Sequence, residues 1–93
     1  MEHEELAKLN RSVLAAEKAR QILDDDVLKL AWDAVELCLI QSWIHSQPED
    51  TRLREDCYFQ LRALASVKKR LTNQVDRGTV AARSLGGDEE ESR

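Results

Sequence analysis

The sequence predicts an all-α protein: a long antiparallel helical hairpin, over about 25–46 and 47–77, with an additional N-terminal helix over about 3–22 and coiled-coil-like packing. One observation behind this prediction is that only three glycines and one proline occur in 93 residues. A second is that apolar residues recur at alternating steps of three and four, as on one face of an α-helix. A third is the content of 34% charged residues, which is typical of long exposed helices. A chain of this length forms a single domain, which we assign to 1–78.

The N-terminal helix is predicted from a narrow apolar stripe. Its members alternate in steps of three and four: Leu6, Leu9, Val13, Ala16, Arg20 and Leu23. Because the stripe is narrow and contains an arginine, we expect this helix to hold weakly to its neighbours. It should lie back against the hairpin or dock onto another subunit, and Leu6, Leu9 and Val13 are therefore candidate interface residues.

Three consecutive aspartates, Asp24, Asp25 and Asp26, predict the boundary between the first two helices. A short carboxylate at an N-cap accepts a hydrogen bond from an unpaired backbone N–H, and acidic neighbours suit the positive end of the helix dipole. A metal site is the alternative, but adjacent residues point in different directions. We therefore interpret the aspartates as a helix cap.

The second helix is the most apolar element, with only a narrow polar strip (Asp33, Glu36 and Gln41). Such a helix must be covered on more than one side, so it is predicted to be the central one. Trp32 and Trp43 lie within about 20° of each other around it and about 16 Å apart along its axis. We expect both to pack near the two ends of the hairpin. The alternative is a pair of interface anchors, because Trp is enriched among binding hot spots.

The third helix is predicted to begin near Ser46-Gln47-Pro48-Glu49, where Ser-x-x-Glu has capping-box spacing and Pro48 suits a first helical turn. It should run to Arg77 and end at Gly78 in the C′ position. Its predicted apolar stripe consists of Leu53, Cys57, Leu61, Leu64, Lys68, Leu71 and Val75. Beyond Gly78 no periodicity is sustained, and 79–93 are expected to form a disordered C-terminal tail.

Two neighbouring aromatic residues, Tyr58 and Phe59, are further interface candidates. One of them is expected to face the core near Trp43, and the other to be partly exposed in a contact surface. The two cysteines, Cys38 and Cys57, both fall on apolar stripes. They are interpreted as small core residues rather than nucleophiles.

Charge is unevenly distributed along a chain whose net charge is −4. Cations gather in the second half of the third helix, and five of them are candidate nucleic-acid contacts: Arg62, Lys68, Lys69, Arg70 and Arg77. The three consecutive cations spread over about 200° of helix surface, and cations near a helix C-terminus suit its dipole. A solvated or intersubunit surface is therefore favoured over phosphate binding, which stays the alternative.

The sequence shows none of the patterns that usually hold a substrate, cofactor or metal. It has no glycine-rich phosphate loop, no Ser/His/Asp arrangement and no metal-ligand spacing. We therefore expect no enzyme activity, no cofactor and no small-molecule ligand. No apolar run approaches the roughly 18 residues that span a bilayer, so no membrane association is expected. Unpaired cysteines without a secretory leader indicate a soluble, intracellular protein.

Several short patterns occur together between Arg20 and Ala82. They are Ala19-Arg20-x-Ile22-Leu23 leading into Asp25, Ala31-Trp32-x-x-Val35-Glu36, Leu39-Ile40-x-x-Trp43, Asp50, Arg54-Glu55, Tyr58, Leu61, Leu64 and Gly78-Thr79-Val80-Ala81. In these residues, mostly packing and capping positions, the chain resembles small helical proteins of tailed bacteriophages and prophages, encoded among structural and packaging genes. It departs from them at Asp26, where such proteins often have proline. The resemblance implies a virion-assembly or host-takeover context and assigns no catalytic residue.

These observations lead to one functional expectation and two alternatives. We expect a non-enzymatic helical assembly protein of phage origin that associates with itself, with another phage protein, or with both. It would act in virion assembly or as a minor structural component, in the host cytoplasm or in the virion. One alternative is a nucleic-acid-binding packaging or regulatory factor, similar to a small terminase subunit, that uses the basic half of the third helix. The other is a host-directed inhibitor whose acidic surfaces mimic DNA.

Overall fold

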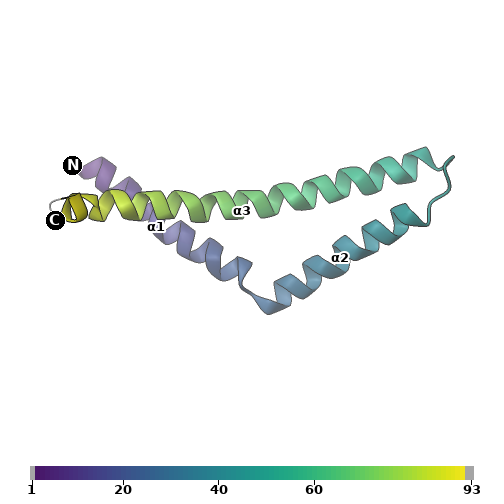
Figure 1. Cartoon of the computed structure of the whole chain (residues 1–93), viewed down its shortest axis with the longest axis horizontal. Coiled ribbons are helices and arrows are strands. Elements are labelled where there is room, and N and C mark those ends of the chain that lie inside the picture. The colour runs from purple at the N-terminus through teal and green to yellow at the C-terminus, as the bar shows by residue number, and fades with distance from the viewer. Residues whose placement is uncertain (1, 92–93) are drawn as a thin grey trace. The chain divides into compact units, whose positions relative to one another are not determined.

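The computed structural model describes residues 2–91 and gives side-chain burial for 2–86. The described part contains three α-helices and no strand: α1 (His3–Leu23), α2 (Asp26–Ile44) and α3 (Thr51–Glu91) (Figure 1). The predicted all-α class is confirmed, and the first two helices begin and end within two residues of the predicted bounds. The third helix differs from the prediction at both ends.

The chain divides into two compact units, and α3 contributes to both of them. One unit consists of α1 and the part of α3 from Arg70 onward. The other, Asp24–Lys69, contains α2 and the first part of α3, joined by a short loop as an antiparallel hairpin (Figure 1).

The unit containing α1 is held together by small side chains. Ala16 and Ala19 of α1 are buried, as are Gly78 and Ala81 of α3. Small residues allow two helix backbones to approach closely, because no long side chain separates them. The N-terminal helix therefore lies against its own chain, which resolves the choice left open by its sequence.

Gly78 has a different role from the predicted helix end. A Cβ built at this position would overlap the Cβ of Ala16 and would lie 3.1 Å from the carbonyl oxygen of Ser12. No described glycine has a positive φ, which a C′ glycine would need. Gly78 is thus the contact point with α1, and the predicted end of the helix at Arg77 is wrong. Of the predicted tail 79–93, residues 79–91 are helical, and 92–93 lie outside the described residues.

The boundary between α1 and α2 matches the cap predicted from the three aspartates. Asp25 is the N-cap of α2, with an extended backbone, and its side chain accepts a hydrogen bond of 2.8 Å from the Leu28 N–H. Asp26 lies in the first turn, where a negative charge complements the helix dipole.

The loop between α2 and α3 does not use the predicted capping box. The Ser46 hydroxyl donates backwards to the Trp43 carbonyl, so it does not cap α3. Pro48 instead lies in a turn in which the Asp50 N–H donates to the Gln47 carbonyl at 2.9 Å. The Asp50 carboxylate also accepts a hydrogen bond of 3.1 Å from the Gln47 N–H. Proline is preorganised for this turn position, so α3 starts at Thr51, after the turn.

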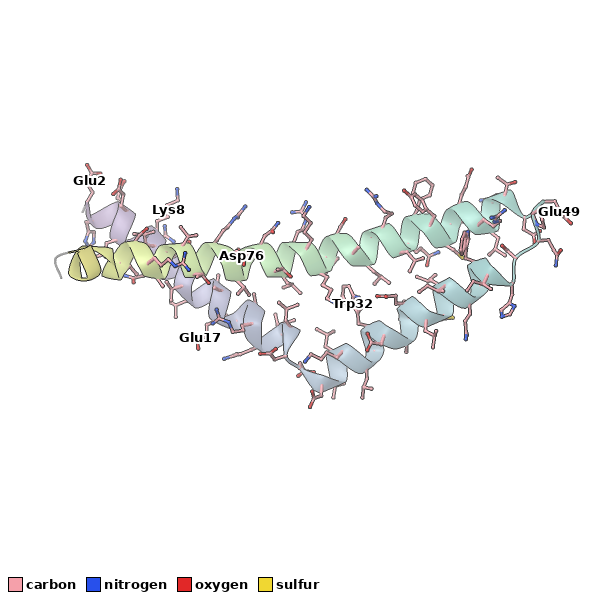
Figure 2. The ribbon with its side chains drawn as sticks, in the orientation of Figure 1. Glu2, Lys8, Glu17, Trp32, Glu49 and Asp76 are labelled. Carbon is pink, nitrogen blue, oxygen red and sulfur yellow. The ribbon has the colours of Figure 1, made fainter. Side chains whose placement is uncertain are left out.

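Among the described residues of the hairpin, one side chain is buried, that of Cys57 on α3. Around it, several larger apolar residues are half-buried. On α2 these are Leu28, Trp32, Leu39 and Ile40, and on α3 they are Leu61 and Leu64. Figure 2 shows Trp32 projecting from α2 toward α3. The part of the predicted α3 stripe from Cys57 to Leu64 thus faces α2, whereas Leu53 and Lys68 are exposed, and Leu71 and Val75 belong to the unit with α1.

Candidate protein–protein interface

The most apolar helix of the chain, α2, contains no buried residue. The sequence predicts that it is covered on more than one side, and within the described chain this prediction is wrong. Large apolar side chains are instead exposed along its length: Val27 (76%), Leu30 (72%), Val35, Leu37 (56%), Trp43 and Ile44 (61%). Exposed apolar surface of this extent makes α2 a candidate interaction site.

Six exposed residues of α2, five of them apolar, form a regular stripe along the helix. Starting at Val27, the steps are three, four, three, four and three: Val27, Leu30, Ala34, Leu37, Gln41 and Ile44. We call these six residues the outer seam. All six are exposed. Helical geometry places the outer seam about 180° from the half-buried face that contains Leu28 and Trp32. The helix therefore has two apolar faces, and α3 covers only one.

A second exposed surface lies at the loop end of the hairpin. The Arg54 guanidinium stands over the Trp43 ring at 5.8 Å, and that of Arg62 over the Tyr58 ring at 5.9 Å. The Tyr58 and Phe59 rings make an edge-on contact, with centroids 5.6 Å apart. We call these five residues the aromatic–arginine surface. Its composition is that of interface hot spots, in which Trp, Tyr and Arg are enriched.

The structure separates the four aromatic residues predicted as interface candidates. Trp43, Tyr58 and Phe59 are exposed at 46%, 54% and 63% and belong to the aromatic–arginine surface. Trp32 is half-buried on the face toward α3 and serves packing. The expectation that either Tyr58 or Phe59 faces the core is wrong, because Cys57 occupies the inward position between α2 and α3.

The three candidate interface residues of α1 differ in their burial. Leu9 and Val13 are half-buried, and Leu6 is 40% exposed. Val13 lines a shallow groove between α1 and α3, together with Gly78 and Ala82. These residues contribute to packing within the chain.

The two cysteines have different environments. Cys57 is 3% exposed, as predicted for a small core residue. Cys38 is exposed beside the outer seam, so its prediction as a core residue is wrong. The reason is that its side of α2 has no covering element in the described chain.

The five cations proposed for nucleic-acid contact are all on α3 and all exposed. Two of them already have interactions within the chain. Arg62 stands over Tyr58, and Lys68 also interacts with another group. A basic residue that is already engaged contributes less to tracking a phosphate backbone than a free one.

Three other features that often mark a functional site are not found in the part of the chain that the structure describes. No group of three or more His, Cys, Asp or Glu side chains is placed to hold a metal ion there. Polar and charged side chains are all at least partly exposed within the same residues. Of the described helices, none combines the length and apolar character needed to cross a bilayer.

Two features of the interface were missed at the sequence level. One is Arg54, whose contact with Trp43 depends on the turn that brings α3 back beside α2. The other is the outer seam. Its three–four spacing was present in the sequence, but α2 is apolar around most of its circumference and the second stripe did not stand out.

Comparison of the chain with protein-family models, curated proteins and solved structures gives no match.

Proposed function

We propose that this protein is a non-enzymatic helical assembly protein that associates with itself through the exposed apolar face of α2. The observation that carries this proposal is that the most apolar helix has no buried residue while four of its large side chains are more than half exposed. Burying one such side chain contributes ~1.5–3 kcal/mol. Leaving this face in water therefore forgoes a large share of the stability available to a small domain.

Light scattering coupled to size-exclusion chromatography tests self-association directly. We expect the full chain, at micromolar concentration and in reducing buffer, to elute with twice the mass of the monomer or a higher multiple. A monomer that keeps full helicity at high micromolar concentration would overturn the proposal.

A role in particle assembly is the biological setting that we propose, and it rests on the resemblance to small proteins of tailed phages. In that setting the partner of the second exposed surface, the aromatic–arginine surface, is another phage protein. The genes beside this one provide the test. Neighbours that encode head, packaging or tail proteins support the setting, and unrelated bacterial neighbours would contradict it.

Nucleic-acid binding by α3 is the second candidate function, favoured by the exposure of all five cations on one helix. It predicts that DNA affinity falls steeply with salt and with neutralisation of those charges. Binding titrations of the parent and of a variant with Lys68, Lys69 and Arg70 all changed to Ala would decide. Equal affinity of the two proteins for DNA would exclude this candidate.

A further inference from the structure

The outer seam of α2 has the pattern of a coiled-coil core. Alternating steps of three and four keep side chains on one line of a slightly underwound helix, where they insert between those of a facing helix. The seam covers 18 residues, or about 26 Å of helix axis. Regular spacing over this length is typical of contact with a second long helix, and a compact binding pocket does not require it.

Five of the six seam residues are apolar, and Gln41 is the polar exception. Its large apolar residues are the most exposed large hydrophobic residues of the helix. The half-buried Leu28, Trp32 and Leu39 lie on the opposite side. The seam can therefore accept a partner helix without displacing α3.

We infer that the occupant of the outer seam is the same seam of a second copy, with the two α2 helices antiparallel around a two-fold axis. This inference rests on the proposed self-association and specifies its surface and direction. A two-fold axis between Ala34 and Leu37 pairs Val27 with Ile44 of the second copy. It also pairs Leu30 with Gln41, and Ala34 with Leu37. Each layer then contains one residue from each helix, as in antiparallel coiled coils.

Charge decides between the two possible directions. Asp24, Asp25 and Asp26 stand at the start of α2, whereas residues 37–48 contain no Asp, Glu, Lys or Arg. A parallel pair would place the two aspartate triplets side by side, and juxtaposed like charges at an interface are strongly unfavourable. An antiparallel pair places each triplet beside the uncharged end of the other helix. The antiparallel direction avoids the repulsion and keeps the same apolar layers.

The exposed apolar side chains of the seam are also consistent with a homodimer contact. On each copy, four large seam side chains are more than half exposed, so a contact between two seams would bury apolar side chains from both copies. An isologous contact needs a surface complementary to itself, and the seam provides it, because the two-fold axis pairs every seam residue with another seam residue.

Disulfide trapping tests the direction of pairing. In a Cys38→Ser background, two variants carry Leu30→Cys and Gln41→Cys separately, and the two are refolded together or each alone under mild oxidation. We expect a covalent dimer from the mixture and little from either variant alone, because the pairing joins position 30 to position 41 of the other copy. The Cys38→Ser protein, which retains buried Cys57, is the control and should give none. Efficient trapping of each variant alone would indicate parallel pairing and overturn the inference.

A charge scan tests the surface independently of cysteine chemistry. Leu37→Glu places a charge in the central layer and should weaken dimerisation on the order of 100-fold, with helicity monitored by circular dichroism. Phe59→Glu, at a similarly exposed apolar residue off the seam, is the matched control and should leave the dimer intact. If Phe59→Glu dissociates the protein and Leu37→Glu does not, association uses the aromatic–arginine surface. In that case the inference falls together with the assignment of self-association to α2, and only self-association itself stands. A parent protein that is already monomeric would overturn both.

Discussion

Individual residues show how the same residue type can serve opposite structural purposes. Gly78 follows a basic residue at the end of a periodic stretch, which is the sequence signature of a helix end. In the structure it is a helical residue against Ala16. The difference is set by α1, a distant segment, so the local sequence alone could not reveal it.

Replacing glycine by alanine at two positions gives opposite predictions. Gly78→Ala should destabilise the protein by about 1–3 kcal/mol, because the new methyl group overlaps Ala16 and forces α1 away. Gly86→Ala is the matched control. Apart from its chain neighbours and its own helix backbone, no atom lies within 4 Å of its Cβ position, so the gain in helix propensity should stabilise by up to ~1 kcal/mol. Urea unfolding measures both, and equal stabilisation by the two changes would mean that α1 does not pack at Gly78.

The N-cap of α2 gives a second prediction at this scale. Asp25→Ala removes the acceptor for the Leu28 N–H and should cost about 1 kcal/mol of unfolding free energy. Asp24→Ala is the control, because Asp24 lies just outside the helix and the cap bond uses Asp25. Thermal unfolding of the two variants under identical conditions provides the comparison. A larger loss for Asp24→Ala would contradict the cap assignment.

At the scale of the elements, periodicity predicted α1 and α2 well and α3 less well. Both of the first two helices are bounded by local signals, the aspartate cap above all. The start of α3 was misplaced because Ser46 and Asp50 are both good caps, and the turn around Pro48 selects between them. Burial on α2 could not be predicted from the sequence, because the apolar character of a residue such as Leu30 does not indicate whether its own chain covers it.

The polar residue of the outer seam provides a prediction for α2 as an element. Gln41→Leu replaces the one polar seam residue by an apolar one facing Leu30 of the second copy. It should tighten dimerisation by roughly tenfold, since an amide buried without a full set of hydrogen bonds costs about 1–3 kcal/mol. Sedimentation equilibrium of the parent and variant measures the change. Ser42→Leu, one residue away and off the seam, should have little effect, and an equal gain in both would indicate nonspecific association.

For the molecule as a whole, we propose that folding and association are linked. The described chain buries only small side chains, namely Ala16, Ala19, Cys57 and Ala81, and no large one completely. A helix of 19 residues such as α2 is marginally stable in water without tertiary packing. On the proposed self-association, a second copy supplies the burial that stabilises α2.

Thermal unfolding at a series of protein concentrations tests this claim most directly. When a folded dimer unfolds to separated chains, the midpoint temperature rises with concentration through mass action. We predict a rise of about 5–10 °C over a hundredfold range of the parent protein, from the unfolding enthalpy expected for two chains of this length. Leu37→Glu should unfold at a lower temperature that does not depend on concentration. A midpoint of the parent protein that stays constant over the same range would contradict the account.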